Sequence, residues 1–161
     1  MIAAVMLLTQ VFIPLQKYNS AVSLMNAEKY EEAIPVFEEL GDYQDSKVDL
    51  LHCKIQYEIK EGDYLNGIVL LVDKISSVGK ENMYRNDYDL LRQCVSKSFS
   101  SYCENGDCGT IYKVEYYDSN TILIYCSGMD TSSMTYTERP QENLKVWLIG
   151  IEASERDNSY L

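Results

Sequence analysis

Apolar residues between Lys17 and Ile75 recur at steps of three and four, which places them on one face of a helix in each segment. Gly41 follows one such run, where glycine commonly ends a helix because it tolerates a left-handed backbone. Asp45 and Ser46 then offer caps for the next helix. The pattern therefore predicts one helix beginning near Lys17 and three more over residues 31–40, 46–60 and 64–75.

The remaining half of the chain changes from helical to β patterning. A further helical pattern covers residues 86–102, within a segment 80–103 that we expect to cap the preceding helices. Residues 104–161 contain short runs rich in β-branched and aromatic side chains, which are typical of strands. The predicted strands cover residues 110–117, 120–127, 134–138 and 144–152. The first two predict a hairpin with a turn of about three residues. The last has apolar side chains on both faces, which predicts a central or covered strand. The sequence thus predicts an α+β fold, in which α-hairpins precede a small antiparallel β-sheet of three or four strands.

The N-terminal segment 1–16 contains no charged side chain. As a helix, about 15 residues would span roughly 22 Å, which is shorter than the ~30 Å hydrocarbon core of a bilayer. A signal peptide should open with positive charge and end in a small-residue cleavage site, and neither is present. Three interpretations stay open: part of a longer anchor, a short complete anchor, or a buried first helix. We favour a membrane anchor, because an uncharged apolar run at a terminus rarely belongs to a small soluble core. Pro14 marks where a helix would kink or restart.

Residues in the helical half recur at an interval of 34 positions, which is the period of the tetratricopeptide repeat, a helix-turn-helix unit. A small residue would let the two helices of a hairpin approach closely, and a bulky one would fill the space toward the next unit. An ordinary four-helix arrangement with chance spacing is the alternative. The recurring pairs are Tyr30 with Tyr64, Ala33 with Gly67, and Phe37 with Leu71.

The stretch EKYEEAIPVFEELGDYQDSK resembles the tetratricopeptide-like repeats of many Firmicute envelope proteins, in which a membrane helix precedes a repeat ending in Leu-Gly-Asp-Tyr-x-Asp-Ser. The resemblance implies repeats over residues 17–79. The second copy departs from it, since Gly67 replaces the usual alanine and no second Gly-Asp-Tyr-x-Asp-Ser ending follows. The resemblance also implies a peptide-binding groove lined by Tyr18, Val22, Met25, Asn26, Asp49, His52, Gln56 and Lys60.

Composition excludes one class of partner. The chain has 25 acidic and 14 basic side chains, a formal net charge of -11. An acidic chain without a Lys/Arg-rich stretch repels phosphate backbones, so we expect no nucleic-acid partner. Tyrosine is abundant, with 14 residues against 3 Phe, which fits the half-buried surfaces of helical repeats and small sheets.

Candidate chemistry is sparse. Cys103 and Cys108 flank a Glu-Asn-Gly-Asp turn, so they are candidates for a local disulfide if that part faces an oxidising exterior. The C-x-x-C spacing of structural zinc sites is absent and His52 is the only histidine, so no metal site is predicted. The sequence has no nucleophile elbow, glycine-rich phosphate loop or HExxH motif. We therefore predict no catalytic residue and no cofactor.

These features favour a non-enzymatic, membrane-tethered protein-interaction module whose partner is a protein or peptide. The resemblance implies that its soluble part faces the outside of the membrane; a cytoplasmic location is the alternative. Two other functions stay open. One is a soluble accessory or binding domain with a buried N-terminal helix, and the other is an enzyme that uses carboxylates of the C-terminal half.

Overall fold

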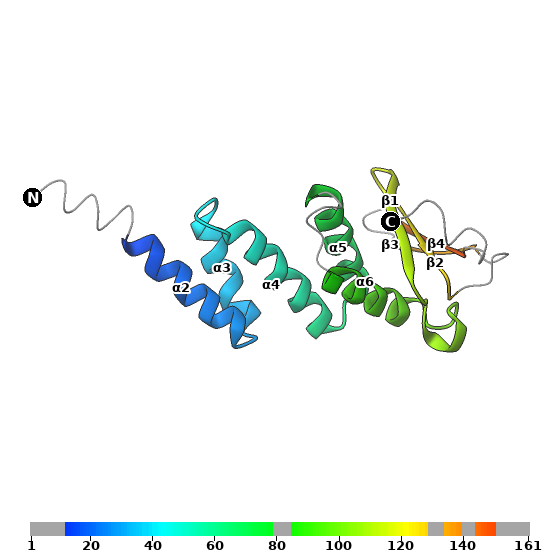
Figure 1. Ribbon diagram of the computed structural model, residues 1–161, viewed down its shortest axis with the longest axis horizontal. Coiled ribbons are helices and arrows are strands. Elements are labelled where there is room, and N and C mark those ends of the chain that lie inside the picture. Colours follow the sequence, from blue (N-terminus) through cyan, green and yellow to red (C-terminus); the bar gives the residue numbers. More distant parts are fainter. Residues whose placement is uncertain (1–11, 79–84, 129–133, 140–143, 151–161) are drawn as a thin grey trace, which may run out of the picture. The chain divides into compact units, whose positions relative to one another are not determined.

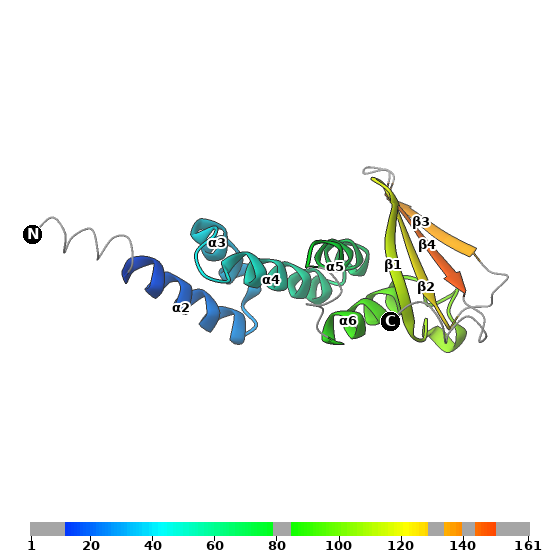
Figure 2. The ribbon, with the colours of Figure 1, turned by 45° about the horizontal axis from the view of Figure 1, so that its top comes forward.

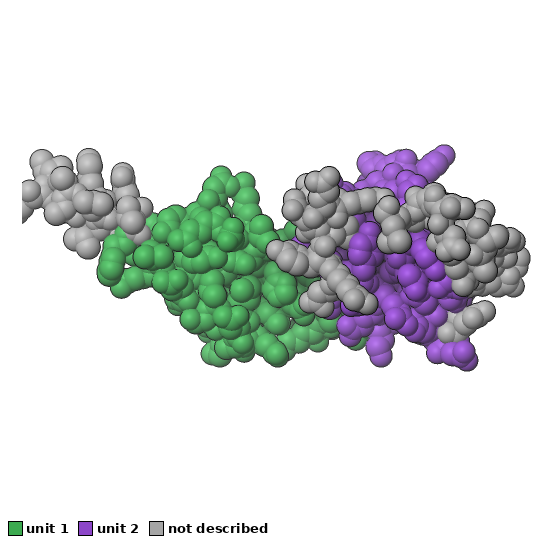
Figure 3. Space-filling view, in the orientation of Figure 1, with its two compact units in different colours: residues 1–66 green, residues 67–161 purple. Residues whose placement is uncertain are grey.

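The computed structural model describes residues 12–78, 85–128, 134–139 and 144–150 (Figure 1). The chain divides into two compact units, Met1–Asn66 and Gly67–Leu161, which Figure 3 shows in different colours. The element order is helices first and strands last, so the predicted α+β class is confirmed. None of the helices in the described ranges is long and apolar enough to cross a membrane. Most of the predicted anchor, residues 1–11, lies outside those ranges.

The described part of unit 1 contains helices α2 (Ile13–Asn26), α3 (Tyr30–Leu40) and α4 (Ser46–Glu61). The two later helices agree with the predicted ranges to within one residue. Helix α2 begins at Ile13, before the predicted start near Lys17, and it carries Pro14 in its first turn. Proline is tolerated there because the first backbone N–H groups of a helix have no partner within the helix. Pro14 thus lies at a helix start, as its chemistry predicts.

The core of unit 1 lies where α3 packs against both α2 and α4. Its fully buried members are two small residues, Ala21 and Ala33, with Phe37 and Cys53. The Phe37 ring meets the Tyr18 ring edge to face, with the centroids 6.1 Å apart. Small residues let helix backbones approach, and the phenylalanine fills the space that is left.

The turn between α3 and α4 shows what the Leu-Gly-Asp-Tyr-x-Asp-Ser ending does. Gly41 has φ +57° and its N–H donates to the Phe37 carbonyl, which ends α3 as predicted. The Ser46 hydroxyl donates back to the Tyr43 carbonyl at 2.5 Å, and the Tyr43 ring packs edge to face on Tyr18. Asp45 stands at the N-cap of α4 without a side-chain cap hydrogen bond. The serine therefore closes the turn and does not cap the helix.

Unit 2 contains most of α5 (Tyr64–Val78), with α6 (Arg85–Ser98) and a short 3-10 turn at Glu104–Gly106. Helix α6 ends four residues before the predicted end at 102. The Lys74 ammonium on α5 donates to Asp87 on α6 at 2.7 Å, and both residues are nearly buried, with 8% and 5% of their surface exposed. The predicted repeat segment ends at 79, whereas the unit boundary falls inside α5. The side chains of Asp73 and Lys74 explain this difference, because both bond to residues of unit 2.

The sheet of unit 2 has four strands in the order β1-β2-β4-β3 (Figure 2). Their bounds are Ile111–Asp118, Thr121–Cys126, Leu144–Gly150 and Met134–Arg139, in that order. The predicted hairpin of β1 and β2 is confirmed, although its turn has two residues because Asp118 pairs with Thr121. Strand β4 lies between β2 and β3, which confirms its predicted central position.

The prediction of a wholly antiparallel sheet is wrong, because β2 and β4 run parallel. Strand β3 comes between them in sequence and pairs antiparallel with β4 on the outer side. The chain therefore passes over to the edge of the sheet before returning beside β2, and β4 arrives in the direction of β2. This pairing lets alternate residues of the two strands share one buried face. Its fully buried members are Ile122, Ile124, Cys126, Val146 and Leu148.

Candidate functional site

The eight residues of the predicted groove lie on two helices of unit 1, four on α2 and four on α4. The structure brings these helices into contact. The Tyr18 hydroxyl donates to the Asp49 carboxylate at 2.9 Å, so one member of each set forms a direct bond. We call the eight residues the α2–α4 surface. The members of this surface differ in exposure.

Tyr18 is a structural anchor of this surface. Its ring packs on Phe37 and Tyr43, with centroids 6.1 and 6.2 Å away. Burial, followed by the hydrogen bond and negative charge of Asp49, raises the pKa of Tyr18 to about 12. The Tyr18 hydroxyl therefore stays protonated at neutral pH and donates its hydrogen bond to Asp49.

The other members divide into packed and open positions. Val22 and Met25 are half-buried and pack against the core of unit 1, so they contribute mainly to stability. His52 and Gln56 are half-buried on α4. Asn26 and Lys60 are exposed. Lys60 donates to the backbone carbonyl of Glu28 at 3.3 Å, which ties the end of α4 to the turn after α2. The open part of the surface is thus at the end that carries Asn26 and Lys60.

A pocket of about 190 Å³ lies at that end, and Lys60 belongs to its wall. Four glutamates and two lysines give the lining a net negative charge, and two tyrosines add aromatic walls. Burial raises the pKa of Tyr30, and the negative charge of Glu61 raises the pKa of Tyr57. Both rings are therefore neutral at physiological pH. The lining residues are Glu28, Lys29, Tyr30, Glu31, Glu32, Tyr57, Lys60 and Glu61.

Sequence reasoning missed this pocket apart from Lys60. The sequence pattern indicated a polar break between helices at residues 28–30. It indicated that Glu31 and Glu32 are acidic residues of a first helical turn, where the helix dipole favours negative charge. Glu61 read as a helix end. Only the packing of α4 against α3 brings these two segments together. The sequence nevertheless contained a signal for this pocket. Tyr30 at the start of α3 and Tyr57 near the end of α4 each lie among charged residues.

We expect Tyr18→Phe to lower the free energy of unfolding of unit 1 by about 0.5–1.5 kcal/mol, because it removes one hydrogen bond and keeps the ring packing. Chemical denaturation gives this value. The matched control is Tyr102→Phe, which changes an exposed tyrosine of unit 2 and should be neutral. Equal stability of the two variants would contradict an energetic role for the Tyr18–Asp49 bond.

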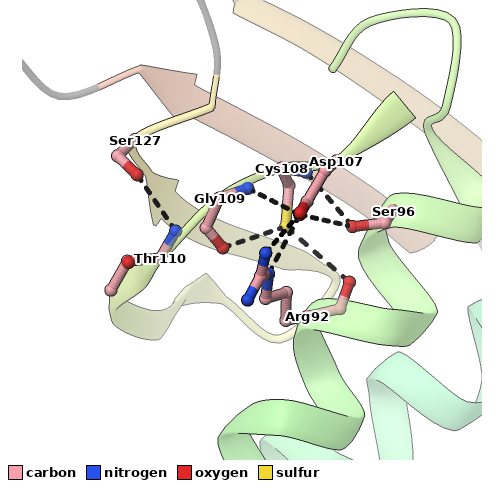
Figure 4. A network of polar contacts seen from close by, with 7 residues as sticks. All are labelled: Arg92, Ser96, Asp107, Cys108, Gly109, Thr110 and Ser127. Atoms are coloured by element: carbon pink, nitrogen blue, oxygen red, sulfur yellow. Dashed lines mark hydrogen bonds and ion pairs between the residues drawn. The ribbon is translucent and has the colours of Figure 1, made fainter. Parts of the chain in front are cut away.

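A second group of polar residues links α6 to the loop before β1 in unit 2 (Figure 4). The Arg92 guanidinium forms a two-pronged contact with the Asp107 carboxylate, through Nε at 2.9 Å and through Nη2. The Gly109 N–H donates to Asp107 Oδ1 at 2.9 Å, and the Ser96 hydroxyl lies 3.4 Å from the same oxygen. The Cys108 N–H in turn donates to Ser96 Oγ at 3.1 Å. This network fixes the course of residues 107–109 against the helix.

Asp107 is held as a carboxylate by these donors. The hydrogen bond from Arg92, followed by the one from the Gly109 N–H, lowers its pKa to about 2. Because the pKa of Asp107 is lower in the folded protein than in the unfolded chain, the carboxylate stabilises the fold. This contribution is complete at a pH above the unfolded-state pKa of about 3.9, and it is lost as the pH falls through about 2. Because Arg92 and Asp107 are each almost half exposed, solvent reduces the energy involved.

We expect carbon-detected NMR titration to give a pKa of about 2 for the Asp107 carboxyl. In Arg92→Met the pKa should rise toward the ordinary value of about 3.9, because the largest stabilising donor is removed. Lys113→Met is a control that removes a lysine paired with another carboxylate, Glu115. An unchanged Asp107 pKa in Arg92→Met would contradict the assignment.

The cysteines are all free thiols, and all five are buried. Cys103 and Cys108 are among them, so the structure does not contain the disulfide predicted between them. Burial raises the pKa of Cys53 to about 11 and that of Cys94 to about 12. In the described ranges no three His, Cys, Asp or Glu side chains are grouped so that they could hold a metal ion.

The two groups differ in what they can do. The network around Asp107 joins segments of unit 2, whereas the α2–α4 surface with its pocket offers open, charged and aromatic side chains to a ligand. Comparison of the chain with known protein families, curated proteins and solved structures gives no match.

Proposed function

We propose that the protein is a non-enzymatic, membrane-tethered interaction module with tetratricopeptide-like repeats, which binds a protein or peptide segment through unit 1. The observation that carries the proposal is the pocket of about 190 Å³ beside the α2–α4 surface. Charged and aromatic side chains in such a pocket can bind a ligand through ion pairs and ring contacts.

The burial pattern supports the repeats. Tyr30 and Tyr64 each begin a helix, α3 and α5. The small residues three positions later, Ala33 and Gly67, are both buried. The bulky residues seven positions after the tyrosines, Phe37 and Leu71, are both fully buried. Positions 34 residues apart are thus buried in both copies, as the proposed repeats would require.

The start of α2 supports the membrane tether. Phe12, Ile13 and Leu15 are exposed apolar side chains, with 51%, 45% and 36% of their surface exposed. They continue the uncharged segment that precedes them in sequence. An apolar surface of this kind needs a cover, and a bilayer provides one. The resemblance to envelope proteins supports placing the soluble part outside the cytoplasm.

Vesicle flotation tests the tether. The full chain should float with phosphatidylethanolamine–phosphatidylglycerol vesicles, and Leu8→Arg should reduce flotation because a charge in the apolar segment costs about 3 kcal/mol within a bilayer. Lys97→Arg keeps charge in unit 2 and serves as the control. Recovery of the wild-type chain in the vesicle-free fraction would contradict the tether.

The charges of the pocket define the kind of segment that it fits. The carboxylates can pair with a lysine or arginine side chain, and the faces of Tyr30 and Tyr57 can contact its cation. The net charge of -11 adds a long-range attraction for basic segments. We therefore propose that the partner contributes a basic, extended or helical segment to unit 1.

Selection from a random peptide library on the full chain tests the binding. Enriched peptides should contain lysine or arginine, and their affinity should fall at least tenfold, about 1.4 kcal/mol, for the pocket variant Glu31→Gln/Glu61→Gln. The matched control Glu39→Gln/Asp89→Asn removes the same charge from exposed positions outside the pocket and should change affinity less than twofold. Equal losses in both variants, or no enrichment, would contradict the proposed site.

A further inference from the structure

The segment that carries Cys108 lies against the end of strand β2. The Gly128 N–H donates to the Cys108 carbonyl at 2.8 Å, and the Ser127 N–H donates to the Thr110 carbonyl at 3.1 Å. These bonds extend the pairing of β1 and β2 beyond the strand bounds, Ile111 opposite Cys126. The backbone around Cys108 is therefore attached to the residues that follow Cys126.

Two glycines make this attachment unusually close. Gly109 has φ +72°, and a Cβ atom placed there would lie 2.6 Å from Ser127 Oγ and 2.8 Å from the Gly128 backbone nitrogen. A Cβ on Gly128 would in turn collide with the Asp107 and Cys108 carbonyl groups. Any larger residue would push the two segments apart. The glycines thus allow a separation at which side chains from the two segments can touch.

The side chains that touch are two thiols. Cys108 and Cys126 are both fully buried, and a side-chain hydrogen bond between them shifts the pKa of each thiol. The Cys108 sulfur also lies 3.7 Å from the Arg92 carbonyl and 3.8 Å from its neighbour's carbonyl on Gly109. Figure 4 shows this sulfur between α6 and the loop. A disulfide needs two cysteines whose backbones are close, and the Cys108 carbonyl accepts a hydrogen bond from Gly128, two residues after Cys126.

We propose that Cys108 and Cys126 are a redox pair that forms a disulfide, which would link the loop before β1 to the end of β2. The pairing differs from the local one between Cys103 and Cys108 that the sequence predicts. The redox pair lies in unit 2, whereas the proposed binding site lies in unit 1.

The two thiols are prepared for different roles. The hydrogen bond from Cys126 lowers the pKa of Cys108 despite burial, with further help from Ser96. The same bond, with burial, raises the pKa of Cys126. The thiolate is the nucleophile in thiol–disulfide exchange, and Cys108 follows the exposed residues Asn105 and Gly106, so Cys108 is placed to react first. Asn105 and Gly106 in the preceding turn are exposed, so a local opening of that turn would admit an oxidant to Cys108.

The oxidant is a small organic disulfide of the glutathione class. The Cys108 thiolate attacks one sulfur of this disulfide, the S–S bond breaks, and one small thiolate leaves and takes up a proton. Cys126 then loses its proton and attacks the Cys108 sulfur of the mixed disulfide, which releases the second small thiolate. Two protein thiols are oxidised, one small disulfide is reduced, and two small thiols are formed.

Oxidation of the full chain with excess oxidised glutathione tests the pair. Thiol counting under denaturing conditions should fall from five to three, and reduction should restore five. Peptide mapping by mass spectrometry should join Cys108 to Cys126. A count that stays at five, only glutathione adducts, or a bridge that includes Cys103 would overturn the proposal.

Variants give a second measurement. Cys103→Ser is the matched control and should still lose two thiols on oxidation. Cys126→Ser should lose none to an internal bridge, because the resolving thiol is missing. If Cys126→Ser fails to fold, the peptide map of the wild-type chain and the thiol count of Cys103→Ser still decide the outcome. A bridge that is abolished in Cys103→Ser would contradict the pair.

Discussion

Lys74→Met should destabilise unit 2 by about 3–5 kcal/mol, the largest effect that we expect from a single charge in this chain. Lys74 and Asp87 have 8% and 5% of their surface exposed, and their charged atoms are 2.7 Å apart. Removal of the ammonium would leave the Asp87 carboxylate buried without this partner. A buried charge that loses its partner costs far more than a surface ion pair contributes.

The double variant Lys74→Met/Asp87→Leu should recover most of the lost stability, because neither charge of the buried pair then remains. Lys97→Met removes an exposed lysine of α6 and should stay within about 0.5 kcal/mol of the wild type. Hydrogen exchange of α5 and α6 peptides measures the effect within unit 2. If Lys74→Met and Lys97→Met exchange at the same rates, the pair does not have the structural role assigned to it.

Phe37→Ala should destabilise unit 1 by about 3–5 kcal/mol, as for other buried phenylalanines. Phe37 is fully buried, lies among Ala21, Ala33 and Cys53, and meets the Tyr18 ring at 6.1 Å. The two neighbouring alanines are too small to fill the cavity. The loss would also loosen Tyr18, so the pocket and the α2–α4 surface should lose order together.

Phe12→Ala is the matched control, because Phe12 is 51% exposed and its loss leaves no cavity. Denaturant titration of each variant, with hydrogen exchange to localise the change, measures the difference. A Phe37→Ala protein as stable as Phe12→Ala would show that α3 does not depend on this core. Peptide affinity measured on folded Phe37→Ala protein should be weaker than wild type if the core positions the pocket.

Local features account for what could be predicted. The bounds of α3 and α4 followed from the spacing of apolar residues and from Gly41. Gly41 ends α3 with a φ of +57°, a backbone conformation that glycine adopts without help from distant residues. The strands β1 and β2 followed from β-branched and aromatic runs, and their hairpin from three polar residues between them. Each of these signals depends on residues that are close together along the chain, so it can be recognised without knowledge of the tertiary structure.

Features that could not be predicted from the sequence depend on contacts between distant segments of the chain. The parallel pairing of β2 and β4 depends on where β3 is placed, and no residue pattern in either strand specifies it. The groove prediction named Lys60 but missed the tyrosines beside it, because the pocket joins the start of α3 to the end of α4. Cysteine spacing pointed to Cys103 as the partner of Cys108, whereas the hydrogen-bonded thiol comes from β2.

The sequence by itself determined the order of helices and strands, the end of α3 at Gly41 and the acidic charge, because these depend on neighbouring residues and on composition. Only the tertiary structure decided the order of strands in the sheet, the buried Lys74–Asp87 pair, the pocket lining and the contact of Cys108 with Cys126. The physical reason is that such pairings gain their energy from burial and close approach between segments that are far apart along the chain.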